Sequence, residues 1–285
     1  MYSFIQRNEE LNAQARGVAQ KGIYLETLRD MEVLLPPQPE QLRIVAILDG
    51  AFEGIATAKA NAEKNLKNAR QLFESHLNSV FSQRGEEWPR IRIEDTCESI
   101  IDCVNKTAPK VDESTPFKMI RTTNVRNGFV CLDSVYSVTE DVFRIWTRRQ
   151  IPKRGDVILT REAPMGEVGM LLSDDQVFLG QRIVSYRADA SKLDNHFLLY
   201  ALQSEDLQKQ IRSLASGSTV QHMRVPDSKN LQLPFPSLNT QRGIATQLNT
   251  LREKTQRLES IYQKKIAALD ALKKAILQKA FSGKL

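Results

Sequence analysis

The chain has 285 residues, of which 41% are hydrophobic and 26% are charged, a composition that excludes an intrinsically disordered chain. Its longest aliphatic run, residues 44–48, is too short to cross a bilayer, and the first residues lack the charged-then-apolar pattern of a secretion signal. The net charge of +6 comes from the C-terminal end, where residues 236–285 carry ten basic and three acidic side chains. Charge alone therefore does not indicate that the middle of the chain binds nucleic acid.

Three cysteines, Cys97, Cys103 and Cys131, show no CxxC spacing. A set this sparse is typical of a reducing compartment, and it predicts core thiols rather than metal ligands or nucleophiles. Together with the missing signal segment, it predicts a cytoplasmic protein.

The first 35 residues resemble a later part of the chain. Residues 1–16 align with residues 201–216 through apolar side chains that include Phe4, Ile5 and Leu11. We expect residues 1–35 to be the remnant, a helix and a tail, of a first domain whose full-length counterpart comes later.

A long helix is predicted for residues 36–87. Prolines at 36, 37 and 39 fit its first turn, and no other proline follows before Pro89. Apolar side chains repeat every seven residues in two rows, which predicts a coiled-coil seam of about five heptads. The interface residues expected from this helix are Leu48, Phe52, Ile55, Leu66 and Phe73.

Residues 88–235 have a different character and predict a mixed α+β domain. Short β-type runs at 117–121, 128–132, 156–160, 167–173 and 182–188 are separated by turn residues. A helix of roughly Asp194 to Leu214 is expected to follow them.

Polar clusters at the ends of these runs offer the chemistry of base reading. Arginine pairs with guanine O6 and N7, and asparagine pairs with adenine N6 and N7, while small hydroxyl-rich loops suit phosphate contacts. Solvated loops are the plainer interpretation of any one cluster, but four clusters in one domain favour DNA contact. The candidates are Arg121, Thr122, Asn124, Arg126, Thr160, Arg161, Gln181, Arg182, Ser218, Thr219 and Gln221, the last three nearer the DNA backbone.

Residues 236–285 predict a second long helix, and they repeat the first one. Residues 31–84 align on residues 231–284 without a gap, with identities that include Gln41/Gln241 and Leu48/Leu248. The expected interface residues of the second helix are Leu248, Leu251, Leu258, Leu269 and Leu272.

The order of the segments predicts how the helices pair. A compact insert brings its two ends together, so the helices flanking it leave from one point and pair antiparallel. In this arrangement the helix pair is a spacer that carries a globular domain at one end. The simpler interpretation of the heptads is a generic coiled coil for dimerisation.

Catalytic motifs are missing from the sequence. It contains no GxxxxGK[ST] phosphate loop, no GxGxxG turn and no Asn/Asp-Pro-Pro-aromatic motif of an amino-methyltransferase. Its three histidines lack metal-ligand spacing. We therefore expect a binding and assembly protein with no cofactor, no metal and no catalytic residues.

The chain resembles the specificity subunits of type I restriction–modification systems. The resemblance lies in residues 33–48 (VLLPPQPEQLRIVAIL) and their echo at 233–248, in the ending AFSGKL, and in 154–169 (RGDVILTREAPMGEVG) and 217–223 (GSTVQHM). It implies a target recognition domain at 88–235 between conserved helices, and partner subunits that supply methylation and restriction. The family carries two such domains, and this chain departs from it by carrying only the tail of the first.

The resulting interpretation is a non-enzymatic DNA-recognition subunit that directs modification and restriction subunits to double-stranded DNA. The helices would act as spacer and partner-docking surface, and two copies would associate to read an interrupted palindrome. The alternative is a coiled-coil scaffold whose head binds protein rather than DNA. A methyltransferase fragment is disfavoured because its motifs are missing.

Overall fold

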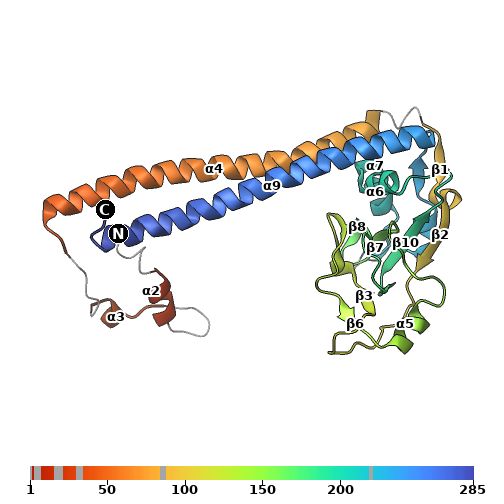
Figure 1. The fold of residues 1–285 in the computed structure, drawn as a ribbon, viewed down its shortest axis with the longest axis horizontal. Helices are drawn as coiled ribbons and strands as arrows, with labels where there is room; N and C mark the ends of the chain where they lie inside the picture. The colour runs from red at the N-terminus through yellow and green to blue at the C-terminus, as the bar shows by residue number, and fades with distance from the viewer. Residues whose placement is uncertain (1, 3–7, 16–21, 30–34, 84–87, 218–220) are drawn as a thin grey trace. The chain divides into compact units, whose positions relative to one another are not determined.

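A computed structural model of the chain describes residues 2, 8–15, 22–29, 35–83, 88–217 and 221–285 (Figure 1). The chain divides into two compact units. The first contains residues 1–72 and 254–285, and the second, called the head here, contains residues 73–253. The head is wider than the predicted domain of 88–235 because it includes the last turns of the first long helix and the beginning of the second.

Two long helices, α4 (Gln38–Gln83) and α9 (Leu238–Phe281), confirm the predicted helical segments. Each begins just after a proline, and each is fixed by the same side-chain bond. Gln41 Nε2 donates to the Pro36 carbonyl at 2.7 Å, and Gln241 Nε2 donates to the Pro236 carbonyl at 2.9 Å. The glutamine shared by both copies of the repeat therefore has one structural role, to close the turn before the helix.

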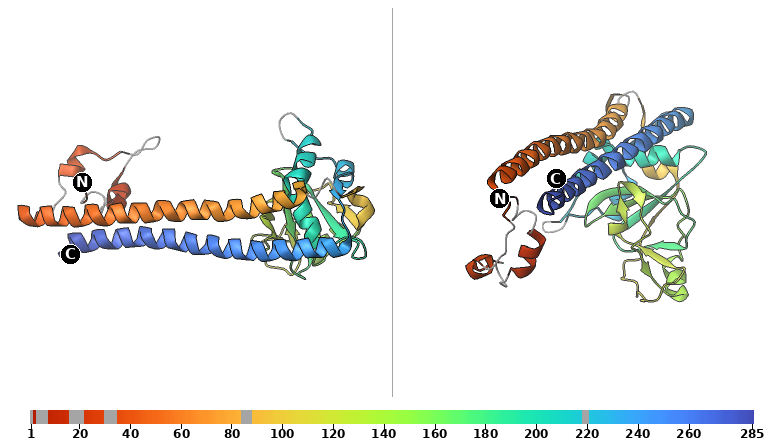
Figure 2. Two further views of the ribbon diagram at one scale, coloured as in Figure 1. Left: turned by 90° about the horizontal axis from the view of Figure 1, so that it is seen from above. Right: turned by 60° about the vertical axis from the view of Figure 1, so that its left-hand side comes forward.

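In the first unit, residues 38–72 of α4 run antiparallel to residues 254–281 of α9 (Figure 2). Two ion pairs set the direction, because Lys59 Nζ lies 2.7 Å from Asp270 and Arg70 Nε lies 2.9 Å from Glu259. The predicted row on α4 is buried, with Leu48 at 0% and Ile55 at 8% exposure. Also in this unit are the short helices α2 (Asn8–Gln14) and α3 (Leu25–Arg29).

Part of the predicted seam on α9 is wrong. Leu258 and Leu272 are 38% and 48% exposed, whereas Leu269 is half-buried, as are Phe52 and Leu66 on α4. The less exposed second row on α9 lies one residue further along than the leucines, with Glu259 and Ile266 half-buried and Ala280 buried. The repeat explains this shift: Glu259 and Ile266 are the 200-residue equivalents of Lys59 and Leu66 on α4, so both helices use the same two rows.

The contacts show the repeat directly. In the first unit Leu48, Leu277, Ile44 and Phe281 belong to one apolar cluster. In the head the 200-residue equivalents, Leu248, Leu77, Ile244 and Phe81, belong to another. Phe73 and Leu251, predicted as interface residues, are half-buried in the head. Each unit therefore contains one copy of the same helix-pair packing.

The head is built on a six-stranded sheet of order β2-β10-β7-β8-β5-β4. Its strands are β2 (Cys97–Asp102), β10 (Ile183–Ala188), β7 (Val157–Arg161), β8 (Met165–Met170), β5 (Gly128–Val130) and β4 (Val125–Arg126). A three-stranded sheet contains β6 (Tyr136–Ser137), β3 (Lys118–Ile120) and β9 (Val177–Leu179). Each predicted β-type run contains a strand, but six further strands in the described part of the chain were not predicted because they are short or lack a clear alternation: β1 (Arg90–Arg92), β2, β4, β6, β9 and β11 (Gln232–Pro234).

The two ends of the insert 88–235 are joined by a short β-ladder. Strand β1 (Arg90–Arg92) pairs antiparallel with β11 (Gln232–Pro234). This pairing confirms that the insert brings its termini together.

Helices cover the head on two sides of its core. The predicted helix 194–214 is two helices, α6 (Asn195–Gln203) and α7 (Glu205–Ser213), because Ser204 is extended (ψ 151) and its hydroxyl caps Leu207. They pack on the sheet and on the end of α4, where the Phe81 and Phe197 rings lie 5.4 Å apart. Helices α5 (Glu140–Trp146) and α8 (Val225–Lys229), and the 3-10 turns η1 (Ile93–Thr96) and η2 (Thr122–Asn124), complete the head.

The cysteines differ from the expectation of three core thiols. Cys103 is buried, and burial raises the pKa of the half-buried Cys97 to about 12, but Cys131 is exposed. Its run, 128–132, is paired only as far as Val130, so Cys131 already lies beyond the strand.

No helix in the described part of the chain is long and apolar enough to cross a membrane.

Candidate nucleic-acid interface

A polar hollow of about 530 Å³ lies where β2 and β7 end and β10 begins. Three residues singled out from the sequence meet there: Arg161 at the end of β7, and Gln181 and Arg182 just before β10. The antiparallel register brings them together, since β10 pairs with β7 from Ile183↔Thr160 onward. The hollow is lined by Asp102, Cys103, Asn105, Arg161, Glu162, Gln181, Arg182, His222, Arg224, Val225 and Pro226.

Arg182 is the most accessible of these candidates. Its side chain is 53% exposed, and its guanidinium lies 3.1 Å from Glu162. Its backbone is left-handed, with φ +69, and its amide donates to Cys103 Sγ while its carbonyl accepts from the Arg161 amide at 2.7 Å. The backbone is therefore fixed from both sides, whereas the guanidinium reaches into solvent.

Arg161 is held more firmly. Its Nη1 donates to the Met223 carbonyl at 2.9 Å, and its Nε is buried with no hydrogen-bond partner among the described residues. Gln181 keeps its side chain at the rim, where its Oε1 accepts from the Thr107 hydroxyl at 3.3 Å. The hollow thus presents guanidinium and amide groups, the two groups that read base edges.

Three ion pairs of the described residues lie around the hollow. Glu162 faces Arg182, Asp102 pairs with Arg149, and Arg224 binds Asp227 at 2.8 Å. In each pair the arginine is the more exposed partner, with 53% of the Arg182 side chain and 69% of the Arg224 side chain accessible, so the guanidinium side of each pair is the one that faces a ligand. Sequence reasoning missed Arg224 and Glu162 as neighbours, because only the fold brings 224–226 beside the end of β7.

Two predicted contact residues are corrected by their burial. Thr160 is 0% exposed, and its hydroxyl donates to the Pro164 carbonyl at 2.6 Å and accepts from the Glu167 amide at 2.9 Å. Asn124 is 1% exposed, and its side chain accepts from the Arg121 amide and donates to the Ser134 hydroxyl. Both side chains stabilise turns and present no surface to a base.

The segment 121–126 lies beside the turn that joins β7 to β8. Thr122 donates from its hydroxyl to the Ala163 carbonyl at 3.2 Å. Arg126 Nη1 donates to the carbonyls of Thr122 and Val125, at 2.9 and 2.6 Å. Arg121 stacks on Tyr136, with its Cζ 3.8 Å from the ring centroid. Both arginines make structural contacts and are half-buried, and the Arg121 Nε is inaccessible.

The fourth predicted cluster, at residues 216–222, is described only in part. Ser218 and Thr219 lie outside the described residues, whereas Gln221 is exposed. Ser216 and His222 exchange backbone hydrogen bonds at 2.9 Å, and a β-bridge joins His222 to Glu162. The loop therefore closes beside the hollow, and Gln221 lies at its base.

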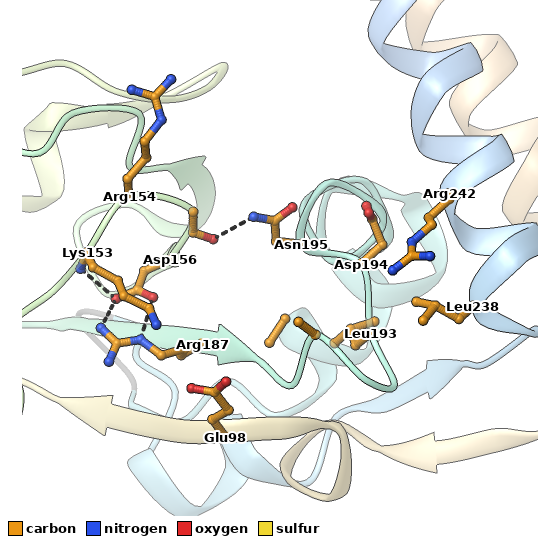
Figure 3. Close-up of a pocket in the computed structure, with 13 residues that line it drawn as sticks. Glu98, Lys153, Arg154, Asp156, Arg187, Leu193, Asp194, Asn195, Leu238 and Arg242 are labelled. Atoms are coloured by element: carbon orange, nitrogen blue, oxygen red, sulfur yellow. Dashed lines mark hydrogen bonds and ion pairs between the residues drawn. The ribbon is translucent and has the colours of Figure 1, made fainter.

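A second hollow, of about 240 Å³, has a different character (Figure 3). At its wall Arg187 donates two bonds to Asp156, at 2.9 and 2.8 Å, and Asp156 is only 2% exposed. The Lys153 amide also donates to Asp156, and Arg187 donates to the Ile151 carbonyl. With these bonds already made, the pair supports the fold rather than a ligand. No cluster that could hold a metal is found among the described residues.

Comparison with known proteins gives the family of the chain. Residues 85–268 match the family model described as the type I restriction modification DNA specificity domain. The type I restriction enzyme MjaVIII specificity subunit of Methanocaldococcus jannaschii is 24% identical over all of this chain and 69% of its own length. The EcoBI specificity subunit of Escherichia coli is 22% identical over 96% of this chain and 63% of its own length.

A solved structure shares the fold. It is described as the structural basis underlying complex assembly and conformational transition of the type I R-M system. One chain of it covers 99% of this chain and 69% of its own length, at 22% identity and a TM-score of 0.76.

Proposed function

The chain belongs to the type I restriction modification DNA specificity family, and from this premise we propose that it is the DNA-recognition subunit of such a system. Specificity subunits bind DNA and associate with methyltransferase and restriction subunits, which carry out the catalysis. The head would read a short target in double-stranded DNA, while the helices would act as coiled-coil spacer and docking surface for the modification subunits. The family relationship disfavours the alternative of a protein-binding scaffold.

The observation that carries the proposal is the polar hollow. It brings together guanidinium and amide groups from separate segments of the chain, on strand ends that their backbone bonds hold in place. Arg161 is held in place by its bond to the Met223 carbonyl, and the exposed Arg182 guanidinium offers donors that an acceptor on a base edge can take. We therefore assign base contact to Arg161, Gln181 and Arg182, with Arg121, Thr122, Arg126, Ser218, Thr219 and Gln221 around them.

Target mapping followed by binding tests this proposal. Methylated adenines would be mapped in cells that carry the chain with its modification subunit, and the complex would then be titrated with target and random duplexes at increasing salt. We expect a steep fall in affinity with salt, by roughly 0.9 in log–log slope for each phosphate contacted, and a preference for the mapped target. A methylation pattern that is unchanged when the chain is removed would refute the proposal.

We further propose that residues 1–35 are the counterpart of the end of the head. In the head Tyr200 packs against Phe73 at 6.0 Å and donates from its hydroxyl to Asn249. In the first unit Tyr2 packs against Phe52 at 5.3 Å, and its hydroxyl donates to Asp49, the repeat equivalent of Asn249. The same kind of tyrosine therefore contacts the same helix position in both copies of the repeat. This equivalence supports the proposed division into 1–35, 36–87, 88–235 and 236–285.

We propose that two copies of the chain associate to read an interrupted palindrome. Its support is the apolar surface of α3 and of the residue before it, where Tyr24, Leu25 and Leu28 are 66%, 63% and 37% exposed. Burial of such side chains against a second copy is favourable. Sedimentation velocity at micromolar concentration should give a dimer, and Leu25→Glu should give a monomer. A monomer for the unmodified chain, alone and with its modification subunit, would contradict the proposal.

A further inference from the structure

A two-residue turn links the short strands β4 and β5. The register pairs Arg126 with Phe129, so Asn127 and Gly128 form the turn. Both are left-handed, with φ +52 and +86, as hairpin turns of this kind require. Arg126, a proposed base-reading residue, is therefore the residue immediately before the turn.

Arg252 of α9 lies against this turn. Its Nη1 is 3.5 Å from the Asn127 carbonyl oxygen, and its Nη2 donates to Gln203 Oε1 at 2.5 Å. The contact with Gly128 is so close that a Cβ there would lie 1.9 Å from Arg252 Nη1. The glycine is thus needed for two reasons, its positive φ and the space for the guanidinium.

Three aromatic rings surround the same guanidinium. Its Cζ lies 4.7 Å from the ring centroid of Phe73, 4.9 Å from Tyr200 and 5.6 Å from Phe129. The rings come from α4, α6 and β5, three elements that the head packs against α9. Burial lowers the pKa of Arg252, and the neighbouring Tyr200 acts in the opposite direction. Arginine is the residue suited to this place because its planar group stacks on rings and forms two separate hydrogen bonds.

We propose that Arg252 is a positioning residue for DNA reading. It fixes the turn at Asn127 and Gly128 to α9, and through the turn it sets where Arg126 and the segment before it are held. Arg252 itself does not contact DNA. This inference rests on the proposed function, since it assigns a role to the 121–126 segment in recognition.

The other copy of the repeat supplies a matched control. Phe52 is the 200-residue equivalent of Arg252, and Lys273 is the equivalent of Phe73, so the ring and the cation have changed places between the two helices. Lys273 Nζ lies 5.0 Å from the centroid of the Phe52 ring. This pair belongs to the first unit, whereas the Asn127–Gly128 turn belongs to the head. A change at Lys273 therefore removes the same kind of contact without touching the turn.

The experiment compares Arg252→Lys and Arg252→Gln with Lys273→Gln. Hydrogen exchange of the Phe129 and Val130 amides would be measured without DNA, and the target-to-random affinity ratio would be measured with it. Both Arg252 variants should speed exchange at the hairpin and lower the ratio by about tenfold, the effect of one charge-assisted hydrogen bond. Lys273→Gln should change neither, and the β10 amides should exchange at the unmodified rate in all three.

Each result decides the inference. Unchanged hairpin exchange in Arg252→Lys would overturn it, and so would faster exchange with an unchanged affinity ratio. If Arg252→Gln also speeds exchange in β10, it has loosened the whole head, and Arg252→Lys alone decides. An unmodified chain that does not distinguish target from random duplex would refute the proposed function instead, and the inferred role of Arg252 with it, even where the exchange data show a fixed turn.

Discussion

Replacing both Arg161 and Arg182 with glutamine is expected to lower discrimination between target and random duplex on the order of a hundredfold. Each arginine that pairs with a base contributes about 1–3 kcal/mol of discrimination, and glutamine keeps an amide but loses the charge and the guanidinium fork. Competition binding, followed by fluorescence anisotropy on a labelled target duplex, would measure the change. Thermal unfolding of the variant would show that the head remains folded.

The matched control removes the same charge elsewhere on the head. Arg144 and Arg148 are exposed, at α5 and just beyond it, and Arg144 pairs only with carboxylates of its own helix among the described residues. Glutamine at both positions should weaken target and random binding alike. Equal loss of discrimination in the two double variants would show that net charge, rather than the polar hollow, governs recognition.

Asp156→Ala is expected to lower the free energy of unfolding of the head by about 3–5 kcal/mol. Arg187 would be left with an unpaired charge at a site where its side chain is 16% exposed, and the Lys153 amide would lose its acceptor. Removing one member of a buried ion pair is strongly destabilising, because the remaining charge stays desolvated. Replacing the whole pair with well-packed apolar residues changes stability much less. Urea unfolding followed by circular dichroism would measure the loss.

Asp174→Ala is the control for this effect. Asp174 lies 3.8 Å from Arg154, and its side chain is 81% exposed. Because solvent screens such a pair, its loss should change stability by less than about 0.5 kcal/mol. If Asp156→Ala costs no more than this, the second hollow is not held together by its ion pair.

The polar candidates show where sequence reasoning about the site stops. Asn124 and Arg182 both lie near strand ends and both have the chemistry to read a base. In the fold, Asn124 is 1% exposed and forms hydrogen bonds within its own turn, whereas the Arg182 side chain is 53% exposed. A polar residue beside a strand can serve either purpose, and only the packing around it decides which.

The helices show the same limit on a larger scale. Heptad spacing identified the row of Leu48 and Ile55 because a seam repeated over many turns leaves a strong period in the sequence. The second row that it predicted on α9, which includes Leu258 and Leu272, is wrong. Leu258 and Leu272 form the more apolar row, yet they face solvent, and their neighbours Glu259 and Ile266 are the less exposed ones. Which row is less exposed depends on how α9 packs against α4.

By itself, the sequence determined the two helices, the 200-residue repeat, the mixed α+β head and the family, because these depend on periodicity and on motifs that are local or evenly spaced. The tertiary structure decided which polar groups meet. Arg161 and Arg182 come together through the β7–β10 register, Arg224 joins them from a distant loop, and Arg252 reaches the Asn127–Gly128 turn across the head. Contacts between segments far apart in the chain depend on how the core packs, and no local pattern encodes them.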